Sequence, residues 1–267
     1  MDIIKENEID DNGGFIKNRE GMMNVMMKKR RRMESAGAVA AMVFFIGAAL
    51  LTSFQTAIYG DSEYRFYEKE YQKYQVAESL SMEMEDIMDV TEKMMAYLIG
   101  EREELSVITR VDGKEQDFFN EQDRFHMAEV KELFLGGLKL RNYMLAAAAV
   151  LVILLVLRRT ELRKVLPRAY FISLGAFGAL TAILGCLFAL DFNKYFTIFH
   201  EIFFDNDLWM FDPAKDYMIR MLPEGFFFDF VIRIGGFFIG GLTFLGILAG
   251  GWVIYESRKR PAGNGKE

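Results

Sequence analysis

The chain has 267 residues, a formal net charge of −6 and one cysteine. The acidic balance argues against nucleic acid as a partner, because binding to phosphates needs a basic surface. A single cysteine excludes both an intramolecular disulfide and a metal site built from several thiolates. Hydrophobic residues make up 52% of the chain and are gathered into separate runs, which is typical of a membrane protein.

Four apolar runs are long enough to cross a bilayer, whose hydrocarbon core of about 30 Å takes about 20 helical residues. They predict transmembrane helices at residues 36–59, 138–157, 169–190 and 230–255. The first run follows a basic segment, as the apolar part of a signal peptide does. It is longer than the roughly 7–15 residues usual there, so we interpret it as an uncleaved anchor.

Lys and Arg gather in three flanks of these helices: residues 28–32, 158–168 and 258–260. Cytoplasmic flanks carry an excess of Lys and Arg, and a four-helix topology puts all three flanks on one side. We therefore predict cytoplasmic tails at residues 1–35 and 256–267 and a cytoplasmic loop at residues 158–168. The segments 60–137 and 191–229 are then expected on the outer face.

The outer segment 60–137 is too long for a simple connection and is expected to form a small, mostly helical extracytoplasmic cap. Apolar residues recur at helical spacing through residues 74–99, which predicts a helix there. The dipeptide Asp112-Gly113 suits the turn of a short β-hairpin, and Asn120 suits the cap of a further helix. The predicted fold class is an all-α integral membrane protein, a four-helix transmembrane bundle with this cap.

The chain has only two histidines, His126 and His200, and both fall in the predicted outer segments. An imidazole with a pKa near 6.5 suits proton transfer at neutral pH. Each histidine lies on the apolar side of a short helix, whereas Glu129 and Glu132 are expected to point away from the face of His126. A structural histidine in an apolar core would have the same surroundings, so the residues alone favour neither role.

The segment 191–229 is expected to hold re-entrant or interfacial helices. Asp212 followed by Pro213 predicts the cap and first turn of a new helix. That helix would place Asp216 one turn before Arg220, at the right spacing for a salt bridge.

Three further residues have two interpretations each. Asn206 fits either a turn or a binding site, and Trp209 is either an interfacial anchor or a hydrogen-bond donor to a substrate. Arg233, just inside the fourth span, should pair with Asp229 one turn earlier or extend its charge to the surface. Cys186 is interpreted as inert, because nothing near it in the sequence would lower the pKa of its thiol.

Two sequence blocks carry a family resemblance: DRFHMAEVKELF at residues 123–134 and FNKYFTIFHEIFFDNDLWMFDPAKDYMIRMLPEGFF at residues 192–227. Together with the four-helix layout, they resemble the bacterial lipoprotein intramolecular transacylase family, Lit. The resemblance extends over roughly residues 36–255, and the length of the second block makes it specific. The basic N-terminal tail is longer than in that family and has no assigned role.

The resemblance implies an acyltransferase of the bacterial cell membrane. Such an enzyme moves the sn-2 acyl chain of a lipoprotein's diacylglyceryl group to the α-amine of its N-terminal cysteine, which leaves a lyso-form lipoprotein. The two essential histidines of the family fall on His126 and His200, on the outer face where diacylated lipoproteins are anchored. The implied partners are the diacylated lipoprotein and membrane lipid, and no cofactor or metal is implied.

Within this implied mechanism we favour His200 as the base, because the phenylalanines around it disfavour the imidazolium, and His126 as the acid. Backbone amides of residues 206–209 and the indole of Trp209 are candidate oxyanion donors. The candidate substrate-binding residues are Asn206, Trp209, Asp212, Asp216 and Arg233.

The sequence leaves two other functions open. A metal sensor or transporter would use the histidines and nearby carboxylates as ligands, although two histidines are few for a transition-metal site. A non-catalytic membrane scaffold would instead use the outer cap to bind a partner.

Overall fold

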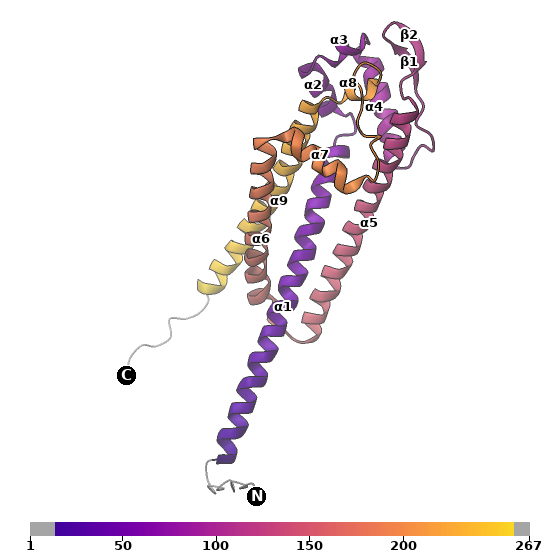
Figure 1. Cartoon of the computed structure of the whole chain (residues 1–267). Coiled ribbons are helices and arrows are strands. Elements are labelled where there is room, and N and C mark those ends of the chain that lie inside the picture. Colours follow the sequence, from indigo (N-terminus) through magenta and orange to yellow (C-terminus); the bar gives the residue numbers. More distant parts are fainter. Residues whose placement is uncertain (1–13, 259–267) are drawn as a thin grey trace, which may run out of the picture.

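Four long helices and a small cap at one end of them make up the fold (Figure 1). The computed structural model describes residues 14–258. The long helices are α1 (Gly14–Tyr59), α5 (Glu121–Leu157), α6 (Leu162–Leu190) and α9 (Glu224–Arg258). Each contains an 18-residue stretch that is apolar enough to cross a membrane. The prediction of an all-α integral membrane protein with four spanning helices is therefore confirmed.

All four long helices begin ahead of the spans that hydropathy predicts, and α6 begins at Leu162 instead of residue 169. α1 includes the basic residues 28–32, and α9 begins ahead of its predicted span. α5 runs without a break from the cap into the second span, so the expected boundary at residue 137 does not exist. Gly136 and Gly137 do not end α5, because a glycine costs only about 1 kcal/mol in a helix relative to alanine.

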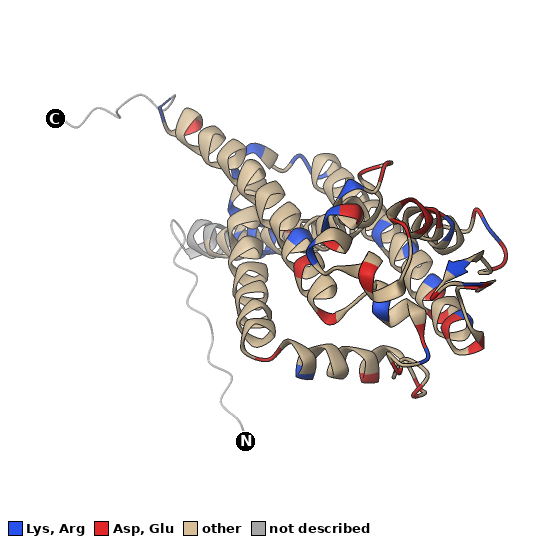
Figure 2. Cartoon of the chain, turned by 90° about the horizontal axis from the view of Figure 1, so that it is seen from above, with Lys and Arg blue, Asp and Glu red and all other residues tan. Residues whose placement is uncertain are grey.

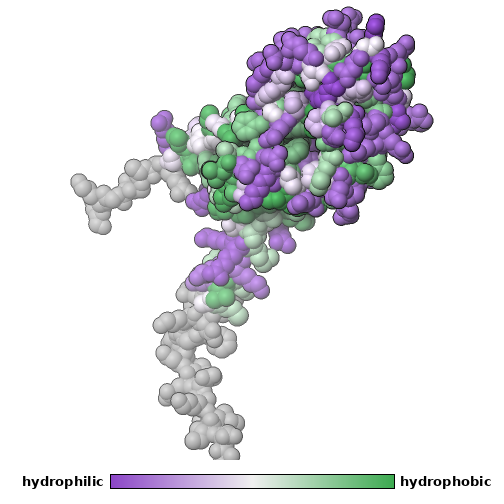
Figure 3. Space-filling model, turned by 45° about the horizontal axis from the view of Figure 1, so that its top comes forward, coloured by the Kyte–Doolittle hydropathy of each residue, from purple (hydrophilic) through white to green (hydrophobic). Residues whose placement is uncertain are grey.

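α1 packs against each of α5, α6 and α9, and α6 also packs against α9. The buried residues of α1 include several small ones: Ala38, Ala41 and Ala48 have no exposed surface. Small side chains let helices approach closely, which favours their association in lipid. Many larger apolar side chains of α5, α6 and α9 are exposed, and apolar surface is visible below the more polar cap (Figure 3).

The cap consists of short elements that precede α5 and one that precedes α9. They are α2 (Arg65–Lys73), α3 (Val76–Leu80), α4 (Met84–Leu98), β1 (Ile108–Val111), β2 (Lys114–Asp117) and α8 (Tyr217–Met221). The predicted hairpin is confirmed, because β1 and β2 are antiparallel. Its turn residues Asp112 and Gly113 both have positive φ, 48° and 74°, as a type I′ turn requires. Seen from above, acidic residues are spread over the cap (Figure 2).

The single helix predicted for residues 74–99 is wrong, because the chain turns between α3 and α4. Ser81 has a left-handed backbone with a φ of 50°. Leu80 and Met82 are buried on either side of it. The amide of Asp112 donates a hydrogen bond to the carbonyl of Leu80 (3.0 Å). A hydrogen bond from the hairpin thus satisfies a free carbonyl at the end of α3. Apolar periodicity alone does not reveal such a partner.

One hydrophobic core unites the cap with the start of α9. The cap contributes Tyr71, Ile87, Phe118 and Phe119, which are at most 1% exposed. From α9, the ring of Phe226 stacks on Tyr71 with the ring centroids 5.9 Å apart. The cap therefore cannot separate from the bundle without opening this core.

Replacement of Gly225 by Ala tests the junction between α2 and α9. An added Cβ would lie 2.5 Å from the ring of Tyr74, whose hydroxyl donates to Asp229 (2.6 Å). The clash should displace the ring and break that bond, so we expect the free energy of unfolding to fall by about 1–3 kcal/mol. Thermal unfolding in detergent measures the loss.

Gly136→Ala is the matched control, because a Cβ at that helical position meets nothing within 4 Å. It should leave the unfolding temperature unchanged or raise it slightly, since alanine is the better helix former. An equal loss of stability in both variants would show that the Tyr74 contact is not the cause.

Candidate active site

The two histidines lie close together on α5 and on α7 (Phe192–Phe203), the short helix drawn at the end of the bundle that meets the cap (Figure 1). His126 is in the second turn of α5, and His200 is in α7, which follows α6 after Asp191. Their ring centroids are 6.0 Å apart, and the two residues are 6% and 8% exposed. Segments far apart in the sequence thus form one buried pair of imidazoles.

α5 begins with a capping box that fixes the start of the helix. The side chain of Asn120 accepts a hydrogen bond from the amide of Asp123 (2.9 Å), and the side chain of Asp123 accepts one from the amide of Asn120 (2.9 Å). These bonds satisfy amides that the first turn leaves unpaired. The prediction that Asn120 caps this helix is confirmed. His126 follows Asp123 by one turn, so the box also sets the position of the imidazole.

Aromatic rings enclose the pair. Phe204 lies against both imidazoles, with centroid distances of 4.9 Å to His126 and 5.5 Å to His200. Phe211 contacts His126 (5.4 Å), and the indole of Trp209 stacks on His200 (4.9 Å). These rings exclude water from the imidazoles, which makes the charged form of each costly.

A backbone contact within α7 sets the tautomer of His200. Its Nδ1 lies 2.7 Å from the carbonyl oxygen of Phe196, a group that can only accept a hydrogen bond. We therefore assign the proton to Nδ1, which leaves Nε2 with a lone pair. Burial lowers the pKa of His200 below its ordinary value, although the bond to Phe196 partly opposes this. His200 is thus a neutral imidazole at neutral pH.

His126 differs from His200, because its Nδ1 is buried without any hydrogen-bond partner. Leaving a buried polar atom unpaired costs about 1–3 kcal/mol. Such atoms occur at functional sites, where a bound molecule supplies the missing hydrogen-bond partner. Two buried imidazoles close to each other can accept and donate protons. That is the chemistry of general acid–base catalysis.

Side chains of α5 hold the segment between α7 and α8 in place. Asn206 donates from Nδ2 to Oε1 of Glu129 (2.8 Å). Gln122 donates from Nε2 to the carbonyl of Leu208 (3.0 Å), the residue before Trp209. The two bonds fix the ring that stacks on His200 relative to the helix that carries His126.

The sequence pattern did not indicate the roles of Gln122 and Glu129. Glu129 was expected to point away from the face of His126, and its contact with Asn206 was not foreseen. Gln122 is one turn before His126 and Glu129 is one turn after it. Helical spacing around the histidine could therefore have indicated both residues.

Asp216 is buried where this segment meets the capping box. It is 4% exposed and accepts hydrogen bonds from the Asn120 side chain (2.7 Å) and the Asp212 amide (2.6 Å). These bonds close a turn, so the helix predicted to start at Asp212 is wrong and α8 begins only at Tyr217. The Asp212 side chain is exposed and pairs with Lys215 (3.1 Å).

The predicted pairing of Arg220 with Asp216 is also wrong. Arg220 reaches the turn of the hairpin instead, where its Nη1 lies 2.9 Å from Oδ2 of Asp112. The carboxylate of Asp216 is already occupied by its buried partners. Arg220 therefore links α8 to the hairpin and takes no part in the imidazole pocket.

The predicted pairing of Arg233 with Asp229 is wrong for a similar reason. Asp229 pairs with Lys73 and accepts a hydrogen bond from Tyr74, both at the end of α2. Arg233 lies over the ring of Phe66, 4.3 Å from its centroid, and its Nε is buried without a partner. This arginine belongs to the contact between α2 and α9, whereas the histidines belong to α5 and α7.

A match to a protein family decides what kind of protein this is. The family described as lipoprotein intramolecular transacylase Lit matches residues 39–227. This chain belongs to the Lit family. The matched range contains both histidines and every candidate site residue except Arg233. No curated protein matches the chain.

Solved structures share the fold of this Lit family member. The membrane integral lipoprotein intramolecular transacylase Lit from Bacillus cereus aligns with a TM-score of 0.67 and 21% sequence identity, over 87% of this chain and 100% of that one. A variant of that protein with a histidine replaced by arginine gives a TM-score of 0.66 at 21% identity, over 90% of this chain and 100% of that one. The likeness extends to the four-helix bundle and its cap.

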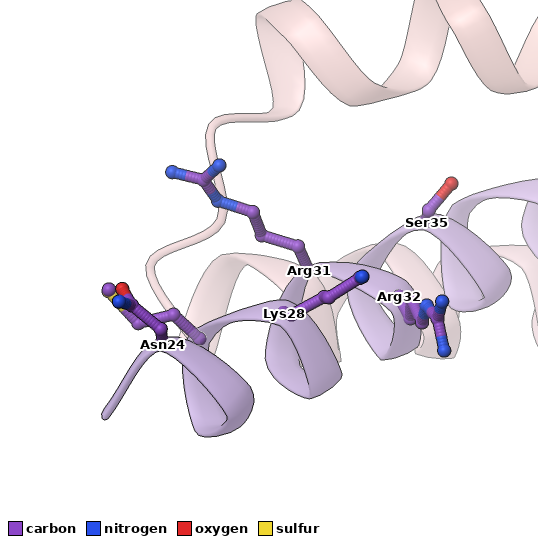
Figure 4. Close-up of a pocket in the computed structure, with 6 residues that line it drawn as sticks. Asn24, Lys28, Arg31, Arg32 and Ser35 are labelled. Carbon is purple, nitrogen blue, oxygen red and sulfur yellow. The ribbon is translucent and has the colours of Figure 1, made fainter. Parts of the chain in front are cut away.

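The basic end of α1 lines a recess on the surface of this Lit family member. Figure 4 shows Lys28, Arg31 and Arg32 around it, together with Asn24 and Ser35. All five residues are exposed, so this recess lacks the buried, titratable groups of the histidine pocket. Within residues 14–258, no group of three or more His, Cys, Asp or Glu side chains is placed to bind a metal ion.

Trp209→Ala should raise the pKa of His200 towards 6.5, because removal of the stacked indole admits water and lessens the cost of the charged ring. With only two histidines in the chain, NMR titration of the imidazole C–H signals measures the shift, and a His126→Gln variant assigns them. Trp209→Phe is the control, since it keeps a ring against the imidazole. An unchanged pKa in Trp209→Ala would contradict the role of the enclosure.

The depressed pKa also has a consequence for stability. Because the unfolded chain binds the proton more readily than the folded one, His200 should lower the free energy of unfolding as the pH falls below 6.5. In Trp209→Ala this contribution should shrink, so the pH dependence of thermal unfolding is a second readout of the same change.

Proposed function

We propose that this Lit family member is an acyltransferase that converts a diacylated lipoprotein to its lyso-form. The sn-2 acyl chain of the diacylglyceryl group moves to the α-amine of the N-terminal cysteine in the same molecule. The observation that carries the proposal is the pair of buried imidazoles, 6.0 Å apart between centroids and packed against aromatic rings. Membership of the family supplies the substrate class.

The reaction needs no further reactant. The amine nitrogen attacks the ester carbonyl, a carbon–nitrogen bond forms, and the bond from that carbon to the sn-2 oxygen breaks. One proton leaves the nitrogen and one is added to the glycerol oxygen. Donor and acceptor belong to one molecule, so little translational entropy has to be removed to bring them together. What the protein must supply is the movement of one proton and a dry, ordered pocket.

We assign the base to His200 and the acid to His126. The free Nε2 of His200 follows from the contact of its Nδ1 with Phe196, and it can accept the proton of the attacking amine. Burial lowers the pKa of His126 to about 4, so this ring is neutral, and it gives its ring proton to the departing oxygen in the same step as it receives one from His200. A transfer from His200 to His126 returns both rings to their starting state, because one proton was taken and one was given. The indole of Trp209 and the backbone amides of residues 206–209 are candidate donors to the oxyanion.

The candidate substrate-binding residues divide into two groups in this mechanism. Trp209 stacks on His200, Asn206 donates to Glu129 one turn after His126, and Asp216 accepts from Asn120 at the start of α5. Asp212 is exposed and Arg233 belongs to the contact with α2, so each would act only on an outlying part of the lipoprotein.

The proposed place of the protein is the bacterial cell membrane, with both termini in the cytoplasm and the histidine pocket on the outer face. The basic residues 28–32 and 158–168 support this orientation, because they lie at the other end of the bundle from the cap. Arg30 donates to the carbonyl of Arg158 (2.8 Å), which joins the two basic clusters on one side. Diacylated lipoproteins are held in the outer leaflet, level with the pocket.

His126→Gln and His200→Gln should each reduce conversion to the lyso-form by about 100-fold or more, because general acid–base groups contribute about that much or more to a rate. The measurement is expression in a host without any N-acylating enzyme, followed by mass spectrometry of lipoprotein N-termini. Glu201→Gln, an exposed neighbour in α7, is the control and should keep wild-type conversion.

Both histidine variants should remain folded and inserted in the membrane, as thermal unfolding would show. Full conversion in both variants would end the two-histidine mechanism. The wild-type chain failing to convert any lipoprotein would end the proposed activity itself and favour a non-catalytic scaffold.

The orientation can be tested with single cysteines. Cys186 is exposed, so it is first replaced by alanine. A membrane-impermeant maleimide added to intact cells should label Lys114→Cys in the hairpin, whereas Lys28→Cys on the basic end of α1 should be labelled only after lysis. The reverse pattern would invert the topology and place the histidines on the cytoplasmic side.

A further inference from the structure

The carboxylate of Glu129 has one oxygen with a partner and one without. Glu129 follows His126 by one turn of α5, so the two side chains adjoin on the helix surface. Its Oε1 accepts the hydrogen bond from Asn206 (2.8 Å). Its Oε2 is buried and has no hydrogen-bond partner. A buried polar atom is thus left unsatisfied one helical turn from His126.

The basic residues nearest to Glu129 along α5 are engaged elsewhere. Arg124 pairs with Asp117 (2.6 Å). Lys131 donates to the carbonyl of Arg102 (3.0 Å) and lies over the ring of Tyr97. In the part of the chain that the structure describes, Glu129 has no ion pair. A buried carboxylate without a cation is costly, so a site of this kind is completed by a ligand that brings the charge.

We propose that Glu129 binds the α-ammonium group of the lipoprotein's N-terminal cysteine. The inference rests on the proposed function, whose substrate brings a primary amine into this pocket, and that amine is protonated in water at neutral pH. Asn206 holds one oxygen of the carboxylate and so fixes its orientation, which leaves Oε2 as the acceptor for the ammonium. The ammonium would then lie beside His126. It would also lie close to the segment between α7 and α8, which places Trp209 over His200.

This assignment gives the pocket a way to distinguish substrate from product. Before transfer the nitrogen is an ammonium that pairs with the carboxylate. It loses one proton to solvent to become the attacking amine, and a second to His200 as the carbon–nitrogen bond forms. After transfer the same nitrogen is a neutral amide with one N–H, so the pairing is lost. The ion pair with Glu129 would then explain both the specificity for a free N-terminus and the release of the acylated product.

A purely structural role for Glu129 makes a different prediction. In that case its only task is to accept the hydrogen bond from Asn206, and Glu129→Gln would preserve the acceptor oxygen at nearly the same place. The substitution removes the negative charge and keeps the acceptor for Asn206. It therefore separates ammonium binding from a purely structural role. Glu132→Gln is the matched control, because Glu132 is an exposed glutamate of the same helix.

The probe is a lipopeptide with two ether-linked alkyl chains on its glyceryl-cysteine, which has no ester to transfer, so binding is measured apart from turnover. It is used with a free N-terminus and with an acetylated one, on the full chain in detergent. The wild type and Glu132→Gln should bind the free amine about tenfold or more tighter than the acetylated form, as expected of a charged hydrogen bond. Glu129→Gln should bind the two forms equally.

Equal binding of both probes by the wild type would overturn the inference, and this comparison requires no variant to fold. Retention of the preference in Glu129→Gln would overturn it as well. Conversion of an ester-linked lipoprotein by the wild type is measured in parallel. Conversion without any preference for the free amine would remove the role of Glu129 alone, whereas a chain that converts nothing would remove the proposed function.

Discussion

The packing of α5 against the segment that follows α7 is the constraint on which the site depends. α5 carries His126, while His200 and Trp209 come from α7 and that segment. The hydrogen bonds from α5 to this segment are the polar contacts that fix the distance between the two imidazoles. The capping box at Asn120 sets where α5 starts and, through Asp216, reaches the far end of the same segment. The relative position of the two histidines follows from this one interface.

Local signals in the sequence were sufficient for much of the architecture. Hydropathy gave the four spanning helices, a two-residue turn gave the hairpin, and an N-cap residue gave the start of α5. The two histidines could be singled out because no other residue in the outer segments combines a suitable pKa with an apolar setting. That they lie in contact could be expected from their predicted topology, since both fall at the same end of the bundle.

The sequence could not reveal partners that meet only in three dimensions. Arg220 and Asp229 each have a residue of opposite charge one helical turn away, yet each pairs across a tertiary contact, with Asp112 and Lys73. Long charged side chains reach well beyond their own helix, and the strength of a pair depends on burial that spacing does not report. The contact of Glu129 was not foreseen for the same reason, since its partner Asn206 lies on a distant segment.

The unbroken course of α5 has a mechanical consequence. A helix whose apolar length differs from the thickness of the surrounding hydrocarbon responds by tilting. A tilt of α5 is carried directly to His126, whereas His200 lies on α7, which joins α6 through Asp191 alone. Lipid composition would therefore change the distance between the two imidazoles. The rate of acyl transfer should then depend on the thickness of the host bilayer.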